Sequence, residues 1–167
     1  MADESPKQRV LLVCEHNAAR SQMAEAFFKE FYGDNFDVYS AGSEPHTIDP
    51  QAIQVMAEIE IDISHQKPNS LNDYSNQEFD YVITICGNYN ACPFFLGGKE
   101  YFIKPCPDPA SFTGSKEERL EIFRQIREEL GDWVQEFYNN QICDETCSEP
   151  NCCDLLAKKT DDDNPCC

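Results

Sequence analysis

The strongest constraint on the fold is a short apolar run that leads into a polar loop and then into a helical pattern. Residues 9–14, Arg-Val-Leu-Leu-Val-Cys, are rich in branched side chains, which is typical of a strand buried on both faces of a parallel sheet. Beyond the loop, Met23, Phe27 and Phe31 recur at helical spacing with charged residues between them. This order predicts a strand, a tight loop and a helix, the repeating unit of α/β folds.

Further strand candidates follow along the chain. Residues 36–41 form the second, which ends at Gly42. Residues 80–86, Asp-Tyr-Val-Ile-Thr-Ile-Cys, are the clearest β-forming segment, and residues 101–103 are a shorter fourth candidate. Because helical patterns separate these strands, we expect an α/β fold with a mostly parallel sheet.

Two later helices are marked by their first residues. Asp49 followed by Pro50 provides an N-cap and a first helical residue. Ser115 and Glu118 have the spacing of a capping box, and the apolar positions after them have helical periodicity. We expect this long helix to end near Tyr138 and to complete the core.

Length and charge limit the classes of partner. The chain has 167 residues, which suits one domain with one core. Its 31 acidic and 13 basic residues give a formal net charge of −18, so its surface should repel nucleic-acid phosphates and anionic lipids. Residues 1–8 have no apolar stretch of the kind found in secretory signals, and residues 10–14 are too short to span a membrane. We therefore expect a cytoplasmic protein without nucleic-acid or membrane partners.

The ten cysteines fall into two groups. Four are spread over the first 140 residues, and six lie in the last 27. Residues 141–167 also hold seven acidic residues against two lysines and have no sustained apolar periodicity. We therefore divide the chain into a domain, residues 1–140, and an acidic cysteine-rich tail, residues 141–167.

Three interpretations of this tail are open. Its thiolates could bind a soft ion such as arsenite, Zn²⁺ or Cu(I), it could have no specific role, or its thiols could be extra redox partners. We favour ion binding. The candidate ligands are Cys143, Cys147, Cys152 and Cys153.

The loop between the first strand and the first helix carries the chemistry. Residues 14–21 read Cys-Glu-His-Asn-Ala-Ala-Arg-Ser, and in this position the loop N–H groups and the helix N-terminus converge on one point. Arg20 can bind two oxygens of a tetrahedral anion, and the same positive field favours the thiolate of Cys14. A buried cysteine beside an ion-paired arginine is the alternative, which the spacing disfavours. The candidate oxyanion-binding residues are Cys14, Asn17, Ala18, Ala19, Arg20 and Ser21.

This segment, VLLVCEHNAARSQMAEAFF, resembles the phosphate-binding loop and first helix of the low-molecular-weight tyrosine phosphatase fold, and within it most resembles the thioredoxin-coupled arsenate reductases. The likeness continues through residues 38–43, 61–64 and 81–86 and covers about residues 9–138. The resemblance implies a four-stranded parallel sheet with helices on both faces. It also implies that the anion loop lies at the carboxyl ends of the strands.

The resemblance further implies a thiol relay. Asp108 would protonate the oxygen that leaves when Cys14 attacks arsenate. Cys86 would then attack Cys14 and expel arsenite, and Cys92 would attack Cys86 and free Cys14, after which thioredoxin would reduce the last disulfide. No cofactor is required, although relatives that bind potassium use residues that map to Asn17, Glu25, Ser40 and Asn69, which suggests a potassium site near Asn17.

The thiols beyond the loop separate the candidate functions. Cys86 ends its strand at the same sheet edge as Cys14, and Cys92 follows within disulfide range if the loop folds back. They could be packed core thiols, but a cysteine among polar loop residues favours redox chemistry, which a phosphatase does not need. The leading hypothesis is thioredoxin-dependent arsenate reduction for arsenic detoxification. The alternatives are a phosphatase that uses only Cys14 and Asp108, and a reductase that draws on glutathione and glutaredoxin or another small thiol.

Overall fold

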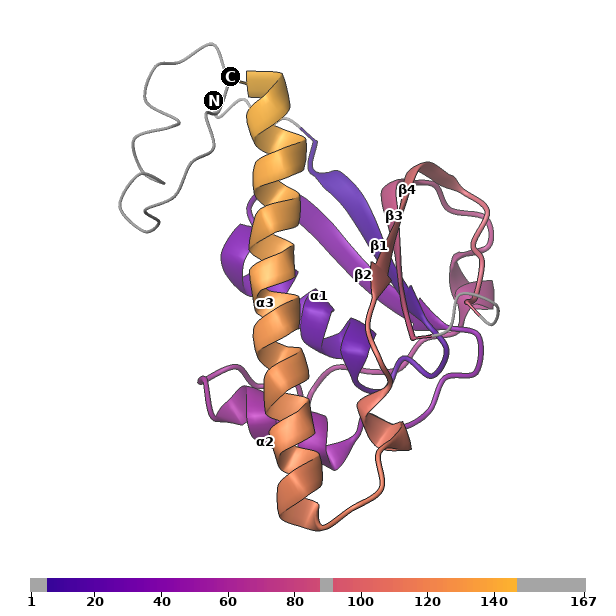
Figure 1. Ribbon diagram of the computed structural model, residues 1–167. Helices are drawn as coiled ribbons and strands as arrows, with labels where there is room; N and C mark the ends of the chain where they lie inside the picture. The colour runs from indigo at the N-terminus through magenta and orange to yellow at the C-terminus, as the bar shows by residue number, and fades with distance from the viewer. Residues whose placement is uncertain (1–5, 88–91, 147–167) are drawn as a thin grey trace.

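The computed structural model describes residues 6–87 and 92–146, with side chains up to residue 141. Four parallel strands form one sheet in the order β2-β1-β3-β4 (Figure 1). Their bounds are β1 Gln8–Cys14, β2 Phe36–Gly42, β3 Phe79–Cys86 and β4 Gly98–Pro105. The four-stranded parallel α/β fold expected from the sequence is confirmed.

Three α-helices contribute to the larger core. They are α1 (Arg20–Tyr32), α2 (Pro50–Ala57) and α3 (Lys116–Thr146), and Figure 1 shows α3 running past α1 and α2. The centre of this core includes Phe28 of α1, Met56 of α2 and Phe123 of α3, all fully buried against sheet residues such as Ile83. Burial of each such side chain contributes roughly 1.5–3 kcal/mol.

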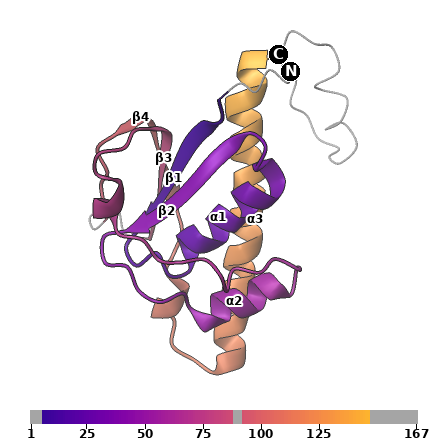
Figure 2. The same ribbon diagram turned by 180° about the vertical axis from the view of Figure 1, so that it is seen from behind.

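A smaller core covers the face of the sheet that points away from α3. Figure 2 shows the molecule from behind, with this face on the left. Leu11, Val13, Phe79 and Val82 pack there with Phe95, and the short 3-10 helix η1 (Leu71–Tyr74) lies against them. A second 3-10 helix, η3 (Pro109–Ser111), precedes α3. The second face is thus covered by a short helix and a loop.

The helix starts follow the sequence signals. The Asp49 carboxylate accepts a hydrogen bond of 2.8 Å from Gln51 N, with Pro50 at the first position of α2. Ser115 Oγ accepts one of 3.2 Å from Glu118 N at the start of α3. Within the described residues, no helix combines the length and apolar character that a membrane span requires.

Two element bounds differ from the sequence prediction. The expectation that the long helix ends near Tyr138 is wrong, because α3 continues to Thr146. No proline lies between the first residue of α3, Lys116, and Pro150 to stop the helix. The boundary drawn at residue 140 therefore falls inside a helix. The strand predicted at residues 101–103 extends over Gly98–Pro105, and its largely exposed edge position explains why apolar patterning identified only its middle.

Candidate active site

The candidate site lies at the carboxyl edge of the sheet. Cys14 is the last residue of the central strand β1, and α1 begins at Arg20, so residues 15–19 form the connecting loop. A pocket of about 300 Å³ opens above this loop. Its walls are Cys14, His16, Ala18, Ala19 and Arg20 from the loop, His46, Thr47, Asp49 and Pro50 from the segment after β2, and Asp108 and Ala110 from the segment after β4.

Asn17 gives the loop its turn. Its φ of 49° lies in the left-handed region, which Asn tolerates better than most residues. This conformation directs the Asn17 N–H toward the Cys14 sulfur at 3.1 Å. At the N-cap of α1, Ala19 has no side-chain oxygen to accept a hydrogen bond, and no side chain caps this helix. The first N–H groups of α1 are therefore available for a bound anion, as the sequence predicted.

A buried hydrogen-bond network orients the polar groups around the Cys14 sulfur. Asn17 Oδ1 accepts from Gln22 Nε2 at 3.0 Å and from Asn69 N at 2.8 Å, which fixes the orientation of the Asn17 amide. Asn17 Nδ2 then donates to Ser21 Oγ at 2.8 Å. Ser21 Oγ lies 2.8 Å from Cys14 Sγ, and its proton can donate to the sulfur of a Cys14 thiolate, which has no proton of its own.

Arg20 is held from the far side of the pocket. Its side chain is buried, and Nη1 donates to the carbonyl oxygen of Cys106 at 3.0 Å. Its Nη2 lies 3.9 Å from Asp108 Oδ2, which makes an ion pair across the pocket. The guanidinium therefore has a fixed plane from which to bind two oxygens of a tetrahedral anion.

Asp108 lines the pocket and faces Arg20 from the segment after β4. Its Oδ1 accepts from Ala110 N at 3.0 Å, which caps η3 and restricts the side chain, while Oδ2 faces Arg20. About a third of the side chain is exposed, so it can exchange protons with water. Asp49, the other pocket carboxylate, is held at the start of α2 by its capping bond to Gln51 N.

Gly42 allows the loop to approach the sheet closely. It pairs in register with Cys14 across the β1–β2 contact. A Cβ atom at Gly42 would lie 2.6 Å from the Glu15 carbonyl oxygen and 2.9 Å from Asn17 N, closer than real Cβ contacts allow. The sharp end of β2 therefore requires glycine because the anion loop occupies the space of any side chain.

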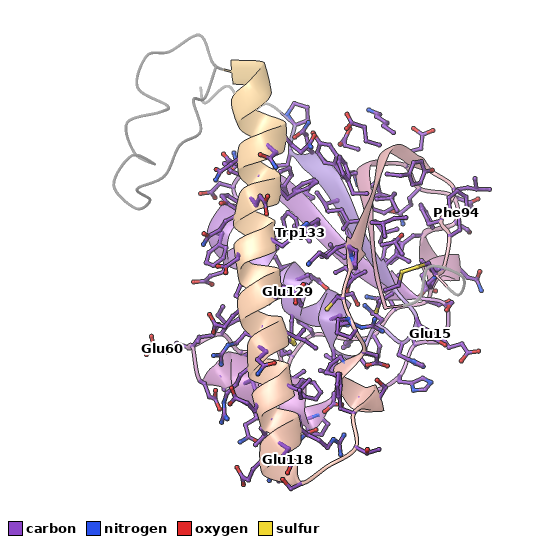
Figure 3. All side chains as sticks on the ribbon, in the orientation of Figure 1. Glu15, Glu60, Phe94, Glu118, Glu129 and Trp133 are labelled. Atoms are coloured by element: carbon purple, nitrogen blue, oxygen red, sulfur yellow. A yellow bond between two sulfur atoms is a disulfide. The ribbon has the colours of Figure 1, made fainter. Side chains whose placement is uncertain are left out.

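The relay thiols are joined to each other. Cys86 ends β3 and forms a disulfide with Cys92, with their Cα atoms 5.8 Å apart, while Cys14 is a free thiol (Figure 3). Cys86 O accepts from Cys106 N at 3.0 Å, which ties the end of β3 to the segment that carries Asp108. Cys86 is buried and Cys92 is partly exposed.

Cys106 is the other free thiol among the described residues, and it is buried. Burial raises the pKa of the Cys106 thiol to about 11, against a smaller opposing effect of the Arg20 charge. Its backbone carbonyl, not its sulfur, contacts the site, through Arg20.

The residues mapped to a potassium site form one connected cluster. Ser40 Oγ donates to Glu25, Asn69 Nδ2 donates to Ser40 O at 3.2 Å, and Asn69 N donates to Asn17 Oδ1. The Lys29 ammonium lies 2.5 Å from the other Glu25 oxygen, so a cation already neutralises that carboxylate. These contacts do not require a metal ion, and potassium binding near Asn17 stays a prediction.

The predicted tail ligands cannot be placed. The side chain of Cys143 and all of Cys147, Cys152 and Cys153 lie outside the described residues.

One wall of the pocket was not predicted from the sequence. Thr47, Asp49 and Pro50 line it because β2 is parallel to β1, so the segment after β2 leaves the sheet beside the anion loop. The strand pattern contained this signal, since parallel strands bring their following loops to one edge.

Comparisons with known proteins agree with this geometry. A family described as low molecular weight phosphotyrosine protein phosphatase matches residues 9–145. The arsenate reductase of Halalkalibacterium halodurans is 39% identical over 132 residues, which are 78% of this chain and 95% of that protein. A solved arsenate reductase in the oxidized state is similar with a TM-score of 0.67 and 30% identity, covering 77% of this chain and 95% of that one. A thioredoxin-dependent arsenate reductase of Corynebacterium glutamicum is similar with a TM-score of 0.55 and 33% identity, covering 79% of this chain and 64% of that one.

Proposed function

The chain belongs to the low molecular weight phosphotyrosine protein phosphatase family and, within it, to the arsenate reductases, and we propose that it reduces arsenate to arsenite with electrons from thioredoxin. One observation favours arsenate reduction over phosphatase activity within this family. A free Cys14 lies under an anion pocket while Cys86 and Cys92, at the same sheet edge, are joined as a disulfide. Phosphate ester hydrolysis needs the first feature only.

The first step is attack on arsenic. Arsenate binds to the loop N–H groups and to Arg20, which places the arsenic above Cys14 Sγ. The Asn17 N–H and the Ser21 hydroxyl lie within hydrogen-bond distance of the sulfur and orient the thiolate that attacks. Cys14 forms an S–As bond, an As–O bond breaks, and Asp108 in its protonated form gives the departing oxygen a proton, so that water leaves.

The second and third steps are thiolate displacements at sulfur. Cys86 attacks Cys14 Sγ, the S–As bond breaks, and arsenic keeps the electron pair and leaves as arsenite. Cys92 then attacks Cys86, and Cys14 leaves as a thiolate, ready for another arsenate. The Cys86–Cys92 pairing with Cys14 free is the arrangement expected after one turnover.

Thioredoxin completes the cycle by exchanging its dithiol for the Cys86–Cys92 disulfide. Cys92 is partly exposed, and Phe94 and Leu96, close to it in sequence, are 70% and 76% exposed. Exposed apolar side chains beside a disulfide suit a docking protein better than a small thiol. Because thioredoxin needs a reducing compartment, we place the protein in the cytoplasm, with arsenic detoxification as its role.

A coupled assay tests this function. The purified protein is mixed with thioredoxin, thioredoxin reductase and NADPH, and absorbance reports NADPH oxidation. Oxidation is expected only when arsenate is added. Replacing thioredoxin by glutathione and glutaredoxin should lower the rate, and equal or faster rates with them would assign the electron donor differently.

The phosphatase alternative predicts the opposite pattern. Cys14, Arg20 and Asp108 are arranged as phosphoryl transfer would require, so an aryl phosphate is the second substrate in the test. The two residues that follow Asp108-Pro109, Ala110 and Ser111, are not aromatic. Rapid aryl phosphate hydrolysis with no arsenate-dependent NADPH oxidation would contradict the reductase assignment.

A further inference from the structure

Two histidines and a glutamate meet at the mouth of the pocket. His16 comes from the anion loop, and Glu44 and His46 come from the segment after β2. One ligand atom from each lies within 4.8 Å of the others, and the two imidazole rings are 4.3 Å apart between centroids. His16 is partly buried and the other two side chains are exposed, so the group is open to solvent on one side.

Backbone hydrogen bonds fix these two segments relative to each other. His46 N donates to His16 O at 2.8 Å, and Glu44 N donates to Glu15 O at 2.8 Å. A third bond, from Asp49 N to Ala18 O at 2.9 Å, extends the pairing. Ligands of a tetrahedral zinc ion lie about 2.1 Å from the metal and therefore about 3.4 Å from one another. The three ligand atoms, all within 4.8 Å of one another, are already close to this separation.

The donor set indicates the class of ion. Two neutral imidazoles and one carboxylate are the ligands of many zinc sites with an open fourth position, whereas Ca²⁺ and Mg²⁺ need more oxygens. Glu15 adds a carboxylate oxygen 3.9 Å from His16 Nε2, and the chain's net charge of −18 concentrates cations at its surface. The histidine pair, and not the acidic groups, selects a transition metal.

We propose that His16, Glu44 and His46 form a binding site for a divalent transition-metal ion, with Zn²⁺ as the matching ion, at the mouth of the oxyanion pocket. His16 and His46 line that pocket together with Cys14 and Arg20. Three protein ligands leave one coordination position, which an oxygen of a bound oxyanion can take. Ion and oxyanion therefore strengthen each other's binding, and by linkage the factor is the same in both directions.

Nuclear magnetic resonance of the imidazoles tests the site without any turnover, so its failure is distinct from failure of the reductase assignment. The chain has three histidines, so the reduced full-length protein gives three imidazole signals. Zn²⁺ is added beyond the amount that the thiols take up. The signals of His16 and His46 are expected to shift, and that of His65, an exposed residue beside Asp62, is expected to stay.

Three variants identify the ligands. His46→Gln should abolish the response of His16, and Glu44→Gln should weaken Zn²⁺ binding by about tenfold or more. His65→Gln is the matched control and should leave both responses intact. Because Glu44 and His46 are exposed, amide spectra should show that their variants keep the fold. Equal shifts of all three signals, no shift at all, or an unchanged His16 response in His46→Gln would overturn the site.

Sulfate tests the link to the pocket, because it is a tetrahedral anion that does not precipitate zinc. With sulfate present, the Zn²⁺ dissociation constant should fall at least threefold, and Arg20→Ala should remove that gain. An unchanged constant would overturn the coupling between the ion and the oxyanion.

Discussion

The sulfur of Cys14 depends on a hydroxyl that is itself oriented by a buried amide. Asn17 Nδ2 donates to Ser21 Oγ, whose own proton can donate to a Cys14 thiolate. A hydrogen bond to a charged group contributes about 1.5–3 kcal/mol, which corresponds to roughly tenfold to hundredfold in rate. We expect Ser21→Ala to slow the first turnover of arsenate by about this factor.

Rapid-quench measurement of arsenite release checks the prediction for Ser21. Ser43→Ala is the matched control, because Ser43 is exposed and its hydroxyl donates only a long hydrogen bond of 3.4 Å to Glu15 O. A Ser21→Ala rate within twofold of the unchanged protein would show that the hydroxyl does not hold the thiolate.

Cys106 makes stability depend on pH in the alkaline range. Burial raises the pKa of its thiol from an ordinary value of 9.0 to about 11, so the folded protein holds a proton that the unfolded chain loses first. The free energy of unfolding should therefore fall as pH rises from about 9 to 11, with the contribution fully present below pH 9. Denaturant unfolding of Cys106→Ala across this range should show a shallower decline. Parallel declines in the two proteins would contradict the assignment.

Some residues of the site could be predicted from the sequence and others could not, for a physical reason. Cys14 and Arg20 lie in one loop whose spacing is visible along the chain, so their roles could be predicted. His46 and Asn69 meet the same loop from distant positions, through pairing that depends on strand order. The family resemblance placed Asn69 beside Asn17, whereas the contact between His16 and His46 depends on β2 being the neighbour of β1, which the apolar patterns alone do not specify.

At the scale of elements, the end of β2 and the anion loop must fit each other. Because a Cβ at Gly42 would lie 2.6 Å from Glu15 O, Gly42→Ala has to displace the loop. We expect kcat/KM for arsenate to fall at least tenfold and Tm to fall as well, since overpacking costs about 1–3 kcal/mol. Gly131→Ala in α3, whose Cβ would meet only the Phe27 ring at 3.3 Å, is the control and should alter Tm without altering kcat/KM. Equal activity of the two variants would refute the steric argument.

The segment between the disulfide and β4 carries the contact expected for thioredoxin. Leu96 is 76% exposed, and burying a leucine side chain contributes about 1.5–3 kcal/mol. Leu96→Glu should therefore raise KM for thioredoxin by about tenfold or more and leave turnover driven by dithiothreitol unchanged. Ile59→Glu is the control, because Ile59 is exposed beside Glu60, which Figure 3 shows on the side of the molecule away from Phe94. An unchanged KM in Leu96→Glu would place the docking contact elsewhere.

Element prediction succeeded where burial and pattern coincide. Apart from Asp80 and Thr84, residues 80–86 are apolar because β3 lies between β1 and β4, and the structure confirms that strand. The edge strand β4 is mostly exposed, so only its middle was visible. The end of α3 was misplaced because its residues packed on the core end at Phe137 and Tyr138, while the helix continues through mostly polar residues to Thr146. Periodicity reports packing, and a helix can extend beyond its packed part.

At the scale of the whole molecule, one turnover moves a pair of oxidising equivalents from the pocket to the surface. Cys14 and Cys86 are buried and Cys92 is partly exposed, so the last displacement brings the disulfide closer to solvent. The order matters, because a donor protein cannot reach the pocket floor. Regeneration therefore depends on the last thiol, which connects the buried chemistry to the partner.

Removing that thiol should stop the cycle at a definite point. In Cys92→Ser, Cys14 can still attack arsenate and Cys86 can still displace arsenite, so one equivalent of arsenite should be released. The protein should then hold a Cys14–Cys86 disulfide, which peptide mass mapping after arsenate treatment would detect, and NADPH oxidation with thioredoxin should fall at least a hundredfold. Cys106→Ser is the matched control, since that buried thiol takes no part in the relay and should leave turnover unchanged. Sustained turnover in Cys92→Ser would mean that another thiol of the chain accepts the disulfide from Cys86.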